Sequence, residues 1–243
     1  IISRLDDGAC EEAFADRIYK AARAAFNTRT IEVEVMAHPG LLKALYEFFS
    51  HRFDPAPALG TADDPTEQCE TFLRVCRTRL ADHPTALQVF RFMAKFVTHC
   101  CKTNFYTPDK RAYSFRLDSG ILDPLVYNRP VYGIFFINGH YASGVHMRSA
   151  DIARGGLRVI PTEPAAYGRQ MENAARLSFI LGPRDSRLKH KDICEGGASG
   201  VIVPHPVYGE YTRDAVLDFI EGILDLTLPN ETVIDYYGRP EML

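Results

Sequence analysis

The periodicity of the sequence changes near Lys102, and this change limits the possible folds more than any other feature. Before it, apolar residues recur at helical spacing in four stretches, namely 11–26, 40–49, 64–80 and 84–101. After it, strand-like runs alternate with helical ones, which is the order of an α/β fold. We therefore predict a mainly helical region over 1–101 and a mixed-sheet α/β domain over 102–243.

Two short segments of the helical region have patterns of their own. The segment "TIEVEVMA" (30–37) alternates Ile31, Val33 and Val35 with glutamates, which predicts a half-buried strand. In "DPTE", Asp64 is placed to cap a helix N-terminus, with proline following at the first helical position. The Pro-, Gly- and Asp-rich stretch before this cap predicts a loop.

Beyond Lys102 the strongest local signal is a hairpin. Asn138-Gly139 separates two strand-like runs, and both residues tolerate the positive φ that a tight hairpin turn requires. The other predicted elements are a strand over 111–118, a helix over 163–181, a buried strand over 200–204, a helix over 212–226 and a strand over 232–237. Together they predict one sheet with helices packed against it.

The composition excludes several classes of protein. Hydrophobic residues make up 46% and charged residues 24% of the chain, as in ordinary globular proteins. The net charge of −3 gives no overall attraction for nucleic acid. No apolar run approaches the roughly 18 residues that span a bilayer. The six cysteines show no C-x-x-C spacing, so neither a disulfide framework nor a metal site is indicated, and a reducing compartment is expected.

Two glycine-rich stretches combine close backbone approach with positive charge. In "DIARGGLR", Arg154 and Arg158 flank Gly155 and Gly156. In "KHKDICEGGASG", two lysines precede a turn containing Gly196 and Gly197. Arginine can fork onto one carboxylate while lysine supplies a point charge to another, so the two loops could hold a small dicarboxylate. The alternative is that they are solvated loops whose glycines serve turns. Neither stretch has the G-x-G-x-x-G pattern of a dinucleotide site.

Six blocks, taken in order, resemble one known family. They are "KTNFY" (102–106), "SFRLD" (114–118), "YGIFF" (132–136), "HMRSADIARGGLR" (146–158), "KHKDICEGGASG" (189–200) and "DYYGRPEML" (235–243). Together they resemble the middle of the large NAD-dependent glutamate dehydrogenases in their eukaryotic form, over about residues 84–243. The first eighty residues are compatible with the N-terminal extension of that family but much less informative.

The resemblance implies a fold, a reaction and a set of site residues. It implies the glutamate-dehydrogenase substrate domain, in a family that oxidatively deaminates L-glutamate to 2-oxoglutarate with NAD as hydride acceptor. By resemblance, Arg154 contacts one substrate carboxylate and Lys189 the other, and the glycine pairs 155–156 and 196–197 allow close approach. The ligand implied is therefore glutamate, 2-oxoglutarate or a similar dicarboxylate.

The match fails at the catalytic lysine. The family has a lysine where this chain has Ser199, and a proline where it has Cys194. A serine side chain cannot act as a general base near neutral pH by itself, and general acid–base catalysis typically raises the reaction rate by about 10²–10⁴-fold. Lys191 could replace the lysine only if it points into the same cavity. His146 lies on a predicted strand next to a charged loop, where a histidine could transfer protons, but a structural, hydrogen-bonded role is favoured.

Both ends of the chain resemble cuts through a longer polypeptide. The sequence begins at Ile1 without methionine and stops directly after a predicted strand, before the catalytic aspartate and the Rossmann domain of the family. We expect no cofactor-binding residues in this chain and no turnover by it alone.

Three functions remain open. The chain could be the substrate-domain portion of a glutamate dehydrogenase, a catalytically degenerate structural subunit of a larger assembly, or a metabolite-sensing module between these two. The resemblance further implies other protein chains as partners. It also implies a mitochondrial location, with the cytoplasm as the alternative.

Overall fold

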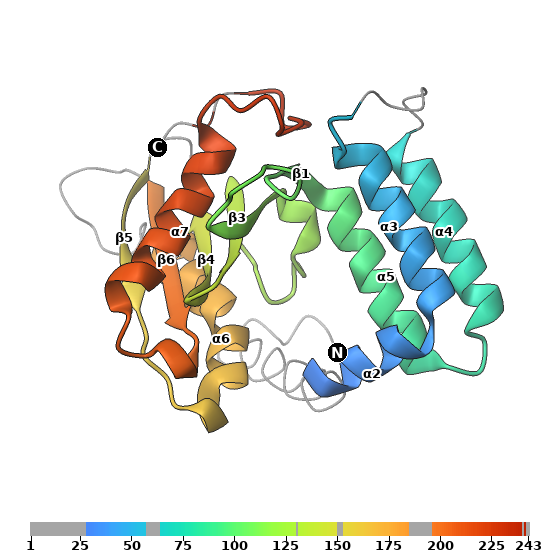
Figure 1. The fold of residues 1–243 in the computed structure, drawn as a ribbon, viewed down its shortest axis with the longest axis horizontal. Helices are drawn as coiled ribbons and strands as arrows, with labels where there is room; N and C mark the ends of the chain where they lie inside the picture. The colour runs from blue at the N-terminus through green and yellow to red at the C-terminus, as the bar shows by residue number, and fades with distance from the viewer. Residues whose placement is uncertain are drawn as a thin grey trace, which may run out of the picture.

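A helical bundle and a sheet layered with helices lie side by side (Figure 1). The computed structural model describes residues 28–56, 64–129, 131–149, 153–184, 196–239 and 241. Helices come first and a mixed sheet of six strands follows, so the predicted α/β class is confirmed. The boundary at 101/102 stays a prediction, and the helix predicted over 11–26 lies outside the described residues.

The bundle is built around three helices with a shared apolar core. Its helices are α2 (Thr28–Ala37), α3 (Pro39–Phe53), α4 (Pro65–Arg79) and α5 (Pro84–His99). The core includes Leu45, Cys76 and Phe90, which are buried between α3, α4 and α5. The predicted cap of α4 is confirmed, because the side chain of Asp64 accepts a hydrogen bond from the Thr66 amide at 2.9 Å.

The sheet has one parallel pair at its edge. Its strands are β1 (Cys100–Thr103), β2 (Ala112–Leu117), β3 (Gly133–Gly139), β4 (Ala142–Arg148), β5 (Ala153–Val159) and β6 (Gly196–Pro204). They lie in the order β1-β2-β3-β4-β6-β5, and every neighbouring pair is antiparallel except β5 and β6. The chain crosses from β5 through α6 (Tyr167–Phe179) before it enters β6.

Two helices cover opposite faces of this sheet. On the α6 face, Val201 and Val203 of β6 pack against Ala174 of α6. On the α7 face, Phe135 and Ile202 pack against α7 (Thr212–Thr227). Because side chains alternate along a strand, these contacts fix the face to which each neighbouring residue points.

Three local predictions are wrong. Residues 30–37 form part of α2, not a strand, and Ile31 and Val33 are largely exposed, so their alternation has no buried face to serve. The 138/139 hairpin exists as β3–β4, but Asn138 and Gly139 are the last residues of β3 and neither has a positive φ. The turn lies two residues later, at His140 and Tyr141, because Asn138 is still paired with Ser143 in the ladder.

Residues 232–237 do not form a strand either. They belong to what we call the C-terminal segment, residues 228–239 and 241, which leaves α7, reaches α3 and β1, and turns back over the sheet (Figure 1). Its contact with the sheet includes one backbone hydrogen bond, from the Tyr236 amide to the Cys101 carbonyl at 2.9 Å. Side-chain interactions, described below, hold it in place.

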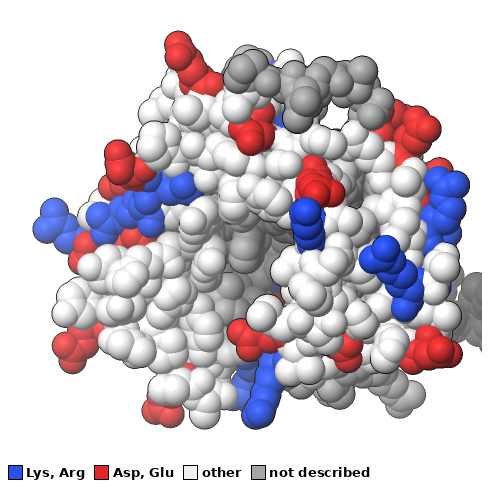
Figure 2. All heavy atoms as spheres, turned by 45° about the vertical axis from the view of Figure 1, so that its right-hand side comes forward, with Lys and Arg blue, Asp and Glu red and all other residues white. Residues whose placement is uncertain are grey.

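The surface has no strong charge of one sign on the face that Figure 2 shows. Acidic and basic side chains are scattered over it, and the face is hollowed near its centre. This distribution agrees with the small net charge of −3. No helix among the described residues is long and apolar enough to cross a membrane.

Candidate functional site

The two glycine-rich stretches lie side by side, but as strands and not as loops. Arg154 is paired with Gly197, Gly155 with Ala198 and Gly156 with Ser199 in the parallel β5–β6 ladder. The prediction of a close-approach turn at Gly196 and Gly197 is therefore wrong, and so is that of a loop at Gly155 and Gly156. The ladder hydrogen bonds of a parallel pair satisfy the backbone groups that a loop would expose.

Gly155 and Gly156 differ in what surrounds them. A Cβ on Gly155 would overlap the carbonyl oxygen of Ala198, so the pairing of β5 with β6 itself requires a glycine there. A Cβ on Gly156 would meet no described atom within 4 Å. Strand packing therefore explains Gly155, whereas Gly156 leaves open space beside β6.

Ser199 lies in a tightly packed part of the sheet. Its exposed fraction is 4%, and by alternation with Val201 it points to the α6 face. Its carbonyl oxygen accepts a short hydrogen bond from the hydroxyl of Ser178, which also accepts one from the Met147 amide at 3.1 Å. Gly182 packs directly over this point, since a Cβ there would lie 3.0 Å from the Ser199 amide nitrogen. The backbone at Ser199 is thus held between β4 and the end of α6.

The predicted cations are only partly placed. The backbone of Arg154 lies in β5, next to Gly197, while its side chain is outside the described part of the structure. Lys189, Lys191 and Cys194 also lie outside the described residues. The roles of Arg154 and Lys189 in binding a carboxylate remain predictions.

His146 lies on the opposite face from Ser199. It pairs with Phe135 and Gly200 across the sheet, and its ring centroid is 6.0 Å from that of Phe135 on the α7 face. Burial, together with the smaller effect of the nearby charge of Arg148, lowers the pKa of His146 to about 4. Its ring is therefore neutral near pH 7, and its buried Nδ1 has no hydrogen-bond partner among the described residues. A neutral, buried ring is consistent with a structural role, but the expected hydrogen bond is not made by Nδ1 within the described residues.

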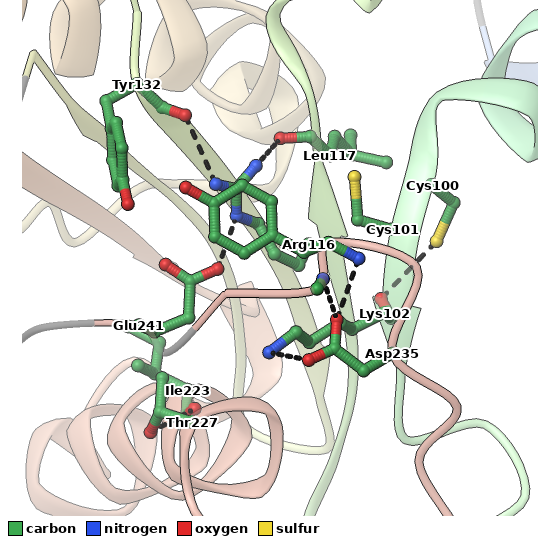
Figure 3. Close-up of polar contacts among 12 residues, drawn as sticks. Cys100, Cys101, Lys102, Arg116, Leu117, Tyr132, Ile223, Thr227, Asp235 and Glu241 are labelled. Carbon is green, nitrogen blue, oxygen red and sulfur yellow. Dashed lines mark hydrogen bonds and ion pairs between the residues drawn. The ribbon is translucent and has the colours of Figure 1, made fainter. Parts of the chain in front are cut away.

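Two ion pairs, one fully buried and one partly exposed, were not predicted from the sequence (Figure 3). The Nε of Arg116 donates to Glu241 at 2.8 Å, and both side chains are fully buried. Lys102 pairs with Asp235 at 2.9 Å. The strand predicted over 111–118 is present as β2, and within it Arg116 is buried whereas Tyr113 is 45% exposed. No motif in the sequence indicated that aromatic side chains would surround Arg116.

Two further features of the described residues bear on possible binding sites. No group of three His, Cys, Asp or Glu side chains among them could hold a metal ion. One open pocket of about 230 Å³ is lined by Ser119, Leu122, Pro124, Tyr127, Arg129 and Val131. Of its six residues, none belongs to the predicted site.

The sequence matches a protein family whose description agrees with the predicted resemblance. Residues 81–164 match the family model of the bacterial NAD-glutamate dehydrogenase catalytic domain. This range contains all of α5 and all of β1 to β5. The class of protein indicated is therefore an NAD-dependent glutamate dehydrogenase.

Individual relatives support the same class over a larger part of the chain. A glutamate dehydrogenase 2 of Dictyostelium discoideum is 30% identical over 98% of this chain and 23% of its own length. An NAD-specific glutamate dehydrogenase of Neurospora crassa is 33% identical over 86% of this chain. A probable NAD-specific glutamate dehydrogenase of Schizosaccharomyces pombe is 32% identical over 90% of this chain. Each match covers 21% of the relative's own length. The resemblance drawn from the six sequence blocks is confirmed, and the chain spans about a fifth of the length of these relatives.

Proposed function

We propose that this chain forms the substrate-binding part of an NAD-dependent glutamate dehydrogenase, which oxidatively deaminates L-glutamate to 2-oxoglutarate. The observation that supports it most directly is the parallel pairing of β5 with β6, which lays Arg154 to Gly156 against Gly197 to Ser199. Segments that are about forty residues apart in the sequence thus meet where the resemblance expects the substrate.

In this proposal the residues bind and orient a dicarboxylate. Arg154 holds one carboxylate by a forked, charge-assisted hydrogen bond, and Lys189 holds the other as a point charge. The open space at Gly156 allows the ligand to approach the backbone. NAD, when bound, supplies the hydride acceptor, and no residue of this chain is assigned to it. Ser199 holds no proton-transferring amine, so the chain alone is not catalytically competent.

Calorimetric titration tests this proposal. We expect glutarate and 2-oxoglutarate to bind, and butyrate, which has one carboxylate, to bind at least tenfold more weakly. Arg154→Ala should abolish the signal, whereas Arg158→Ala, on the same strand, should retain it within about twofold. No binding of any dicarboxylate, or equal loss in both variants, contradicts the proposal.

A structural role in a larger assembly is the second candidate, and the surroundings of Ser199 favour it. A lysine at a position that is 4% exposed needs space that the packing of Gly182 and Ser178 restricts. We expect Ser199→Lys to destabilise the fold by roughly 1–3 kcal/mol, because the larger, charged side chain lacks room or a partner. Urea unfolding measures this, with Ser199→Ala as the control. A Ser199→Lys variant as stable as the parent would instead indicate an open catalytic cavity.

Partners and location follow from the same proposal. β5 is an edge strand that is exposed from Gly155 to Arg158, so we propose that another protein chain covers it, which analytical ultracentrifugation would test. A mitochondrial location rests on the resemblance to eukaryotic relatives alone. Fluorescence imaging of the tagged protein beside a mitochondrial marker would test it.

A further inference from the structure

Arg116 is a buried cation in the middle of the protein, far from the edge of the sheet that the proposed function uses. It stands on β2 opposite Phe135, on the α7 face, whereas Ser199 points to the α6 face. Its side chain is fully buried. Removing a guanidinium from water costs several kcal/mol unless charge and hydrogen bonds replace the lost hydration. The surroundings of Arg116 must therefore supply both.

Three acceptors surround the guanidinium of Arg116 (Figure 3). Its Nη1 donates to the Leu117 carbonyl at 2.6 Å, and its Nη2 donates to the Tyr132 carbonyl at 3.2 Å. Its Nε donates to Oε1 of Glu241 at 2.8 Å. The two carbonyls are fixed in the sheet and the loop before β3, whereas the carboxylate comes from the C-terminal segment. Only the carboxylate compensates the charge.

Aromatic rings complete the site. The guanidinium carbon lies 4.2 Å from the ring centroid of Tyr237, 5.8 Å from that of Tyr132 and 5.7 Å from that of Phe135. Gly133 leaves the necessary space, since a Cβ there would lie 3.0 Å from Nη2 of Arg116. Rings at these distances stabilise a cation and exclude water, so the site is preorganised for a guanidinium with one anionic partner.

Glu241 fills this site as an internal ligand. Its side chain is fully buried, yet its Oε2 has no hydrogen-bond partner among the described residues. Other contacts hold the same segment, namely the Lys102–Asp235 pair and a hydrogen bond from the Tyr236 hydroxyl to the Arg52 carbonyl at 2.7 Å. Glu241 is thus delivered by a tethered segment and makes one good hydrogen bond out of the two that a carboxylate can accept from a guanidinium.

We propose that Arg116, Tyr132, Phe135 and Tyr237 form a receptor for a small carboxylate, and that Glu241 occupies it as the closing residue of the C-terminal segment. A free carboxylate of two or three carbons has the charge and the planar shape to replace Glu241. This site lies on the other face of the sheet from Ser199, so the inference does not depend on the proposed function.

Chemical rescue tests the receptor. Glu241→Ala removes the internal carboxylate and leaves space beside a buried cation, so we expect the melting temperature to fall by about 6–12 °C. Sodium propionate at about 100 mM should restore at least half of that loss, and sodium chloride of equal ionic strength should not. Glu231→Ala, an exposed glutamate of the same segment, serves as the matched control and should neither melt earlier nor respond to propionate.

A second variant assigns the rescue to Arg116. In Arg116→Lys/Glu241→Ala the positive charge remains but the planar guanidinium fork does not. We therefore expect this variant to need at least a tenfold higher propionate concentration for the same recovery of melting temperature. If Glu241→Ala cannot be purified folded, refolding in propionate against refolding in chloride gives the same comparison. An unchanged melting temperature in Glu241→Ala, a loss that propionate does not reverse, or an equal response in the double variant overturns the proposal.

Discussion

The two faces of the sheet treat polar groups in opposite ways. On the α7 face, the buried Arg116 is paired with the carboxylate of Glu241, and His146, two strands away, is held neutral. On the α6 face, at the position where the resemblance expects a catalytic lysine, the sheet carries the uncharged Ser199. The α7 face therefore retains a buried charge together with its partner, whereas position 199 on the α6 face carries no ionisable side chain.

This contrast shows that the buried charge serves the structure. Arg116, Lys102 and their carboxylates hold the C-terminal segment against β1 and β2. By contrast, a catalytic lysine is a cation without a permanent carboxylate, and its conservation depends on turnover. Replacing such a lysine by serine removes a cost of desolvation.

The largest expected effect comes from removing the cation on the α7 face. Arg116→Met leaves Glu241 buried without a counter-charge, and we expect a loss of about 3–5 kcal/mol in the free energy of unfolding. Urea denaturation followed by circular dichroism measures it. Arg213→Met, an exposed arginine of α7, is the control and should stay within about 0.5 kcal/mol. Similar losses in both variants would remove the contrast between buried and surface charge.

The next effect is a pH dependence that His146 contributes. The unfolded ring takes up a proton below about pH 6.5, whereas burial lowers the pKa of folded His146 to about 4. Acid therefore favours the unfolded state, and stability from this group is lost as the pH falls from about 6.5 to 4, by up to about 3 kcal/mol.

The comparison of two variants isolates this contribution. We expect the pH dependence of the unfolding free energy, measured between pH 4 and pH 7.5, to be mostly lost in His146→Gln. The exposed His51→Gln serves as the control and should keep the slope of the parent protein. An unchanged slope in His146→Gln would show that the pKa of His146 is the same in the folded and unfolded states, and would contradict this prediction.

The smallest effects separate the two glycines of β5. Gly155→Ala should cost roughly 1–3 kcal/mol, because its Cβ overlaps the Ala198 carbonyl. Gly156→Ala should leave stability unchanged or raise it by up to about 1 kcal/mol, since the added methyl meets open space. If Gly156 admits a ligand, that same variant should weaken 2-oxoglutarate binding in calorimetry. Equal destabilisation by both would mean that packing alone selects both glycines.

Local signals predicted most of the helices and strands. The cap at Asp64 and the apolar spacing in α3, α5, α6 and α7 carry their own stereochemistry, so no distant partner was needed. The alternation at 30–37 gave a wrong prediction of a strand, because a strand also needs a neighbouring strand with which to pair. These residues instead form part of α2, which packs on α3 and α5. The strand predicted over 232–237 was wrong for a similar reason, because this segment contacts the sheet through side chains and one backbone hydrogen bond and not through a strand ladder.

The candidate site was predictable only in part, for reasons of distance along the chain. The glycine stretches were recognised, but that they pair as parallel strands depends on a crossover through α6. The burial of Arg116 depends on Glu241, 125 residues away, and no periodicity reports such a partner. The alternation in 111–118 predicted a strand, but it did not indicate that an arginine, a residue type that is mostly exposed in proteins, would be buried in it.

The strand order also dictates a sequence of events during folding. β5 precedes β6 in the chain but lies outside it in the sheet, so β5 has no neighbour to join until β6 has docked on β4. Until then, newly made protein holds an unpaired, glycine-containing strand, and the closure of that parallel pair spans a long loop. We expect this edge to be the slowest to acquire protection and the first place where nascent chains associate wrongly.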